Sequence, residues 1–182
     1  MKDYPNILLI AGTGRNVGKT LLACEIIEHI SSTTKVVGVK ISSHLHEVEH
    51  GQKVIISNDS YTIIEECLIN NKDSSRMKQA GASVVFYIQS QKPFVWEAFL
   101  QLPIPIDCGA IVCESGGLHQ YIKPGVFVMV EGGVGANKKS SFPEWHPVIA
   151  RYDNGLLSIS VDDLCFENNT FTYRTKSHAS LL

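Results

Sequence analysis

An apolar run, a glycine-rich turn and an amphipathic segment follow one another at the start of the chain. Residues 6–10 (NILLI) form a mostly apolar run, and apolar side chains recur at helical spacing between Leu22 and Ile30. The turn between them ends in Gly-Lys-Thr. This order predicts a strand, a tight loop and a helix, which restricts the chain to an α/β architecture. The loop residues are Gly12, Thr13, Gly14, Arg15, Asn16, Val17, Gly18, Lys19 and Thr20.

The rest of the chain alternates further strand and helix signals. Residues 35–40 are rich in β-branched side chains, as in a strand buried on both faces of a parallel sheet, and they close a β-α-β unit. The turn-forming segment 57–60 predicts a hairpin between strands at 54–56 and 61–64. Further strands are predicted at 84–87, 110–113 and 126–130, and helices at 74–80 and 93–102. In the tail, Asp-Asn-Gly between residues 148–152 and 156–161 predicts a second hairpin, followed by one strand at 166–173.

A glycine-rich loop that ends in Gly-Lys-Thr between a strand and a helix is typical of P-loop NTPases. Together these signals predict an α/β fold of the P-loop NTPase kind, with three layers in the order α/β/α and a mainly parallel sheet of about five strands. The strands from about residue 145 to 182 are expected to extend the same sheet in antiparallel fashion. A chain of 182 residues with 44% hydrophobic content buries one core, so we expect a single nucleotide-binding domain over residues 1–182.

Charge and cysteine usage argue against several classes of protein. Lys and Arg total 16 against 18 Asp and Glu, so no broad basic field attracts nucleic acid or an anionic membrane. The first residues carry an acid and a proline where a secretory leader would be apolar, and no stretch approaches membrane-spanning length. The five scattered cysteines fit reduced thiols better than a disulfide or zinc framework. We therefore expect a cytoplasmic protein that binds neither nucleic acid nor membrane.

The glycine-rich loop has the chemistry of a phosphate site. Its glycines let successive backbone N–H groups point inward, and the following helix adds the positive end of its dipole. Lys19, the catalytic candidate, is expected to neutralise phosphate oxygens, and the Thr20 hydroxyl to bind Mg²⁺. The usual spacing has a glycine at the position of Thr13, so this loop is a longer variant that begins at Gly12. The predicted ligand is GTP or ATP with Mg²⁺.

Two families share parts of this pattern. Gly12-Thr13 followed by Val17-Gly18-Lys19-Thr20 resembles the phosphate loop of dethiobiotin synthetases. A broader resemblance, over residues 5–130, is to the molybdopterin-guanine dinucleotide biosynthesis protein B family, small P-loop proteins that assist attachment of a nucleotide to the molybdenum cofactor. It rests on the phosphate loop, the strand end Gly38-Val39-Lys40, the run 72–82 (KDSSRMKQAGA) and the strand end Glu114-Ser115-Gly116-Gly117. The resemblance implies GTP and a partner enzyme. The hairpin at 54–64 and the C-terminal strands depart from the family.

Acidic residues near the loop are the candidate metal ligands, because Mg²⁺ between phosphate oxygens takes one or two carboxylates. Glu114 ends an apolar strand, so we expect its carboxylate at the carboxyl edge of the sheet, beside the phosphate loop. Asp73 is the second candidate by resemblance, although a role as N-cap of the helix at 74–80 explains it equally well. Lys40 ends its strand at the same edge, where it either meets an anionic ligand or is an ordinary surface residue. Asp59, which resembles a dethiobiotin synthetase metal ligand in position, is better explained as a turn residue.

Other polar residues give weaker signals. His44, His46 and His50 lie near glutamates in the manner of a metal cluster, but histidines in a loop are common without a metal. The run Asn137-Lys138-Lys139 resembles the guanine-reading element of GTP-binding proteins, without the acidic residue that follows there.

Three functions stay open. The first is a GTP-binding accessory protein of molybdenum cofactor maturation, the second an ATP-dependent ligase or kinase acting on a small carboxylate, and the third a nucleotide sensor without catalysis. No glutamine or histidine is fixed by a motif to position a nucleophile, so slow hydrolysis is expected. Relatives with this loop pair two subunits across the nucleotide, which favours a homodimer, although Gly14 stands where some dimeric relatives have a lysine.

Overall fold

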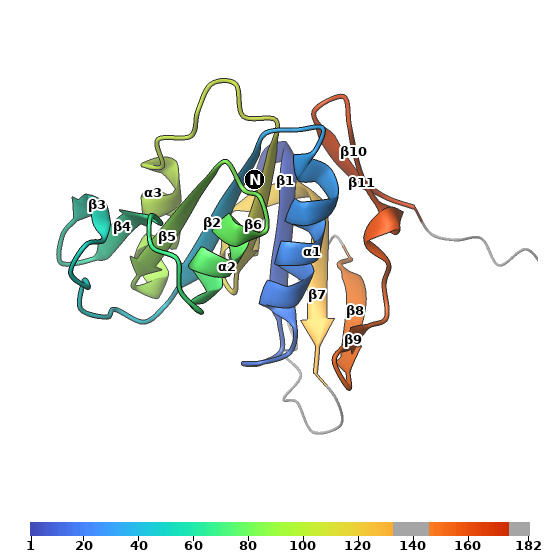
Figure 1. The fold of residues 1–182 in the computed structure, drawn as a ribbon, viewed down its shortest axis with the longest axis horizontal. Coiled ribbons are helices and arrows are strands. Elements are labelled where there is room, and N and C mark those ends of the chain that lie inside the picture. The colour runs from blue at the N-terminus through green and yellow to red at the C-terminus, as the bar shows by residue number, and fades with distance from the viewer. Residues whose placement is uncertain (133–145, 175–182) are drawn as a thin grey trace, which may run out of the picture.

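The computed structural model describes residues 1–132 and 146–174, which form one large sheet with helices on both faces (Figure 1). The strands are β1 (Lys2–Gly12), β2 (Val36–Ser42), β3 (Lys53–Ser57), β4 (Tyr61–Glu65), β5 (Val84–Ser90), β6 (Ala110–Ser115), β7 (Ile122–Glu131), β8 (Val148–Asp153), β9 (Leu156–Leu157), β10 (Leu164–Glu167) and β11 (Thr170–Tyr173). The helices are α1 (Lys19–Ser31), α2 (Asp73–Gln79) and α3 (Val95–Leu100), with short 3-10 turns η1 (Lys92–Phe94), η2 (Leu118–Gln120) and η3 (Val161–Asp163).

The main sheet of the described residues has the strand order β3-β4-β5-β2-β6-β1-β7-β8-β9. The strands from β5 to β8 run parallel to their neighbours, and antiparallel strands are added at both edges. The five parallel strands expected from the sequence are all present, and β8 is a sixth. The predicted hairpin is also confirmed, because β3 and β4 pair in antiparallel fashion at one edge. The α/β class and the mostly parallel sheet therefore agree with the prediction.

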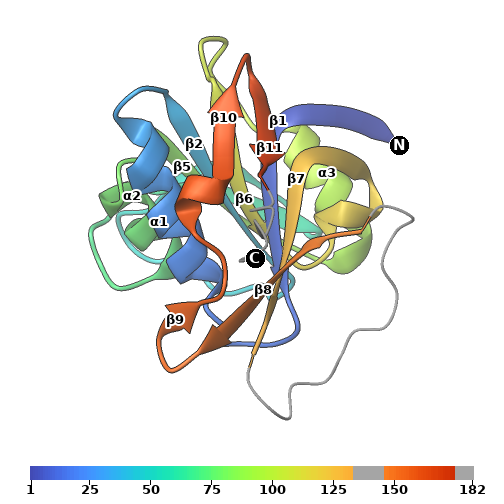
Figure 2. The same cartoon turned by 90° about the vertical axis from the view of Figure 1, so that its right-hand side faces the viewer.

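Two apolar cores lie on opposite faces of the sheet. In β1, Leu8 and Ile10 pack in the core beneath α1 and α2, whereas Ile7 and Leu9 pack in the core beneath α3. Side chains alternate between the faces of a strand, so burial on both faces requires an uninterrupted apolar run. Figure 2 shows the sheet between α1 and α2 on one side and α3 on the other.

The C-terminal strands differ from the prediction. β8 joins the sheet parallel to β7, not antiparallel, and β10 and β11 form a separate two-stranded sheet instead of extending the main one. The single strand predicted at 166–173 is wrong: Asn168 and Asn169 adopt φ values of 51° and 58° and reverse the chain between β10 and β11. The hairpin at Asn154 is confirmed, but β9 ends at Leu157, before the 3-10 turn η3.

The small sheet of β10 and β11 covers the core beside α1. Leu164 and Phe171 are buried in the same apolar cluster as the inner side chains of α1. Neither described range contains a helix that is long and apolar enough to cross a membrane.

Candidate functional site

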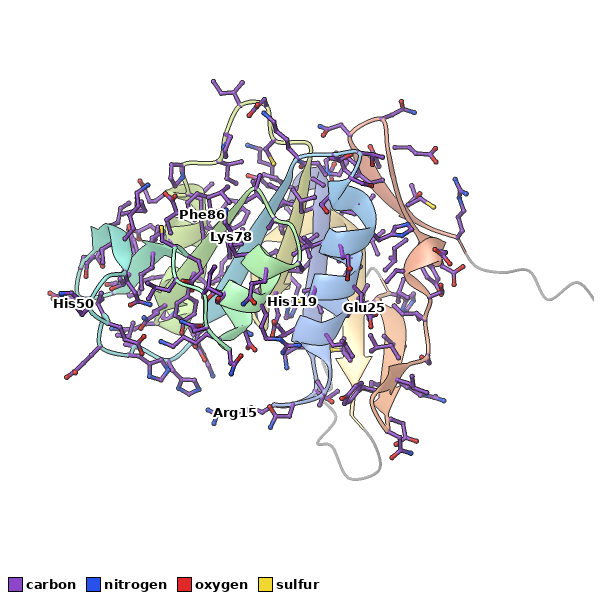
Figure 3. The ribbon with its side chains drawn as sticks, in the orientation of Figure 1. Arg15, Glu25, His50, Lys78, Phe86 and His119 are labelled. Carbon is purple, nitrogen blue, oxygen red and sulfur yellow. The ribbon has the colours of Figure 1, made fainter. Side chains whose placement is uncertain are left out.

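The carboxyl ends of the parallel strands meet the N-termini of α1 and α2 at one edge of the sheet. Thr20 is the second residue of α1 and Asp73 the first residue of α2, while Lys40 and Glu114 lie near the ends of β2 and β6. Figure 3 shows Arg15 at the same edge, in the loop below α1. Ligands of open α/β sheets bind at such an edge.

Four of the predicted site residues converge there. Lys40 Nζ lies 2.6 Å from Glu114 Oε1 and 2.7 Å from Asp73 Oδ2. Thr20 donates its hydroxyl to Glu114 Oε2 at 2.8 Å. The contact follows from strand register, because Lys40 and Glu114 are directly paired positions of the parallel strands β2 and β6. Their side chains therefore leave the sheet side by side, on the face covered by α1 and α2.

Burial makes this cluster an electrostatic unit. Glu114 is 2% exposed and the Lys40 side chain 15% exposed. Burial acts to lower the pKa of Lys40, but the charge of Glu114 and the hydrogen bonds from both carboxylates raise it above its ordinary value. Burial acts to raise the pKa of Asp73, but the hydrogen bond and the charge of Lys40 hold that pKa below its ordinary value. Both directions favour the charged forms, so an ammonium group lies between two carboxylates.

The glycine-rich loop closes on its own lysine. Lys19 donates to the carbonyl oxygen of Gly14 at 2.5 Å. The stem of Lys19 passes over Gly12, where an added Cβ would lie 2.8 Å from Lys19 Cδ. Val17, which is buried, anchors the loop in the core beneath α1. The loop thus encloses an ammonium group in the place predicted for phosphates.

The loop backbone uses left-handed conformations at two positions. Asn16 has a φ of 56° and Gly18 a φ of 86°. Asparagine and glycine adopt this region most easily. Gly18 is required for a second reason: a Cβ there would lie 2.6 Å from Cδ2 of Tyr152, on β8. No sequence signal linked Tyr152 to the loop, because its approach depends on the parallel pairing of β8.

Thr13 stands where the usual loop spacing has a glycine. Its backbone N–H donates to the carbonyl of Val130 at 3.0 Å, and its hydroxyl accepts from the N–H of Gly132 at 3.3 Å. The pairing of β1 with β7 therefore continues one residue past Gly12. Thr13 ties the base of the loop to the end of β7.

Asp73 is not the predicted N-cap. Lys72 occupies the N-cap position of α2, no side chain caps the helix, and the Asp73 carboxylate turns to Lys40. The start of α2 is held instead by Glu66, which sequence reasoning missed. Its buried carboxylate accepts from Ser74 Oγ at 2.6 Å and from the backbone N–H of Leu68 at 3.0 Å. Glu66 follows another glutamate at the end of β4, and this pattern gives no signal of such burial.

The remaining candidates lie outside the cluster. Arg15 Nη2 donates to His44 Nε2 at 3.0 Å, which links the glycine-rich loop to the segment after β2. Over residues 1–132 and 146–174, no group of three or more His, Cys, Asp or Glu side chains could hold a metal. Asp59 lies in the turn between β3 and β4. The strands β5 and β2 lie between this hairpin and β6, which carries Glu114. The run 137–139 lies outside the described residues.

A cavity of about 470 Å³ adjoins the loop on the face of the sheet covered by α3, and Gly12 and Ser115 contribute to its wall. The charged cluster lies on the opposite face. One edge of the sheet therefore carries the loop, the cluster and the cavity.

Comparison of the chain with protein-family models, with curated proteins and with solved structures gives no match. Function is therefore inferred from the site itself.

Proposed function

We propose that the chain binds a nucleoside triphosphate together with Mg²⁺ on the loop from Gly12 to Thr20. The observation that carries the proposal is the position of the Lys40 ammonium, a cation held between the oxygens of Asp73 and Glu114. Carboxylate and hydroxyl oxygens are ligands that suit Mg²⁺. Thr20, Asp73 and Glu114 would hold the metal, which when bound neutralises phosphate charge and polarises the phosphoryl group.

Lys40 and Mg²⁺ compete for the same oxygens. Mg²⁺ sites usually combine one or two carboxylates with substrate phosphates and waters, and the described residues contain no group of three His, Cys, Asp or Glu that could hold a metal alone. A nucleotide adds phosphate oxygens and gives the displaced Lys40 ammonium a new anionic partner. The metal is therefore expected to bind with the nucleotide and only weakly without it.

Inside the loop, the Lys19 ammonium is expected to exchange a protein acceptor for a phosphate oxygen. Its ammonium donates to the neutral carbonyl of Gly14, and a phosphate oxygen is a stronger acceptor than a carbonyl. The backbone N–H groups at the start of α1 add the positive end of the helix dipole. Phosphate binding thus replaces the Lys19–Gly14 hydrogen bond with a charge-assisted one.

Slow hydrolysis is part of the proposal. In the described part of the chain, no glutamine or histidine is hydrogen-bonded to Lys40, Asp73 or Glu114. Without such a residue to position a water, attack on a γ-phosphate is expected to be slow. The resemblance to the molybdopterin-guanine dinucleotide biosynthesis protein B family favours GTP and an accessory role with a partner enzyme.

The ATP-dependent ligase or kinase is a second candidate, and the cavity beside Gly12 favours it. A pocket next to the phosphate loop suits a small acceptor. Phosphate release that rises with added small carboxylates supports this candidate, whereas a rise only with a partner enzyme supports the accessory protein. Binding without turnover in either case leaves a nucleotide sensor.

The test is thermal unfolding with GTP, ATP or neither, each with and without Mg²⁺. A ligand at about 100 times its Kd stabilises the folded state by about 2.7 kcal/mol, which raises the Tm by several degrees for a chain of this size. We expect a rise that needs both nucleotide and Mg²⁺. If the Tm does not rise in any of the four samples that contain GTP or ATP, the proposal is overturned.

A further inference from the structure

The cavity on the α3 face, which we call the α3 pocket, is a second candidate binding site. Its volume of about 470 Å³ lies in the range of small-molecule sites. Its walls come from the ends of β1, β2, β6 and β7 and from η1, α3 and η2. Ser115 lines the pocket, while Glu114 beside it faces the charged cluster, because neighbouring side chains of a strand point to opposite faces.

One wall of the α3 pocket is apolar. Ile41 of β2, Val95 of α3 and Met129 of β7 line it. The ring of Tyr121 also lines the pocket and is stacked on Trp96, with centroids 6.1 Å apart and planes 7° apart. This wall suits an apolar ligand body.

The charge at the α3 pocket is positive. Lys92 lines it and no aspartate or glutamate does. Across the described residues, no carboxylate forms an ion pair with Lys92, which is exposed to solvent. In another cavity of this edge, the lining lysines Lys40 and Lys72 are both paired with carboxylates. Lys92 therefore offers its charge to a ligand.

We propose that the α3 pocket binds a small organic anion, whose apolar body lies against Ile41, Val95 and Met129 and whose charged group meets Lys92. Gly12 belongs to the phosphate loop and also lines the α3 pocket, so this ligand would lie next to the loop. Its role as the second ligand beside a nucleotide rests on the proposed function. Its binding does not, because Lys92 and the apolar wall take no part in the phosphate site.

The probe for this site is 8-anilinonaphthalene-1-sulfonate, an organic anion with an apolar body whose fluorescence rises on burial. Three variants are titrated beside the natural chain. Lys92→Glu reverses the charge of the pocket. Gly117→Leu adds a side chain at a wall position where an added Cβ has no atom within 4 Å and where φ is −134°, so the backbone is not strained. Lys78→Glu, on α2 at the opposite face (Figure 3), is the matched charge control.

Saturable binding is expected in the natural chain and in Lys78→Glu. Reversing an exposed charge should weaken binding about fivefold in Lys92→Glu, and Gly117→Leu should weaken it about tenfold or more by filling the pocket. The neutral analogue N-phenyl-1-naphthylamine should lose affinity in Gly117→Leu but not in Lys92→Glu. Unaltered affinity for the anion in both pocket variants, with their Tm unchanged, would overturn the proposal.

Nucleotide-dependent melting of the same proteins separates the two proposals. If the natural chain shows no shift with nucleotide but the pocket variants lose the anion, the nucleotide site is wrong and the α3 pocket stands. If nucleotide shifts the Tm but both pocket variants bind the anion as the natural chain does, the α3 pocket is wrong and the nucleotide site stands.

Discussion

Replacing Lys40 with Met removes the ammonium between Asp73 and Glu114 and retains most of the aliphatic stem. Glu114 is left as a buried carboxylate, with the Thr20 hydroxyl as its hydrogen-bond donor. Removing one partner of a buried ion pair costs about 3–5 kcal/mol, a large share of the 5–15 kcal/mol typical of a folded domain. With a urea m-value of about 2 kcal/mol per M, the midpoint should fall by about 1.5–2.5 M.

The assay is urea denaturation followed by circular dichroism, with and without Mg²⁺. Lys53→Met is the matched control, because Lys53 also contacts a carboxylate at 2.7 Å, that of Glu65, but at the exposed edge of the sheet. It should leave the midpoint unchanged. Mg²⁺ alone should stabilise Lys40→Met more than the natural chain, since the oxygens of Asp73 and Glu114 lose a competing cation. Equal midpoints for Lys40→Met and Lys53→Met would refute the buried pair, and equal Mg²⁺ effects would refute the competition.

Two further predictions concern the loop and the thiols. Gly12→Ala should destabilise the chain by about 1–3 kcal/mol, because the new Cβ meets the Lys19 stem at 2.8 Å. Gly14→Ala is the control, since its Cβ would have its closest contact at 3.7 Å, and it should melt as the natural chain does. Equal melting temperatures for the two variants would show that Lys19 does not cross Gly12. Iodoacetamide at neutral pH should label the exposed Cys67 first and Cys113 last, because Cys113 is fully buried and burial raises its pKa. Mass spectrometry of timed samples checks the order of labelling. Early labelling of Cys113 would contradict the burial of β6.

The first half of the fold could be predicted because its signals are local. The apolar run of β1 is buried on both faces, and the inner positions of α1 recur at helical spacing, so each element shows its environment in its own residues. The hairpin of β3 and β4 has a turn segment between two apolar runs. Such patterns do not depend on which strands become neighbours.

The tail could be predicted only in part because its pairing is not local. The turn at Asn154 and Gly155, both with positive φ, makes β9 antiparallel to β8 but does not decide how β8 meets β7. The connection between β7 and β8 is long enough for β8 to run either parallel or antiparallel to β7. Asn168 and Asn169 did offer a signal, since two consecutive asparagines suit a two-residue turn, and it explains why one predicted strand is two.

In the candidate site too, features that depend on local sequence could be predicted, whereas contacts between distant segments could not. Glu114 and Lys40 were each predicted at the carboxyl edge from the strand that they end. Their direct contact depends on β2 and β6 being neighbours in matching register, which no single segment reveals. The burial of Glu66 and the approach of Tyr152 to Gly18 likewise depend on packing between distant segments.

Equilibrium binding of Mg²⁺–GTP and Mg²⁺–ATP, measured by titration calorimetry on the natural chain and on Lys19→Ala, tests the central claim most directly. The account predicts one saturable site in the natural chain and a loss of about 10- to 100-fold in affinity in Lys19→Ala, because a charge-assisted hydrogen bond to phosphate contributes about 1.5–3 kcal/mol. Circular dichroism should show that Lys19→Ala keeps its fold. No binding by the natural chain, or the same affinity in a folded Lys19→Ala protein, would contradict a nucleotide site on this loop.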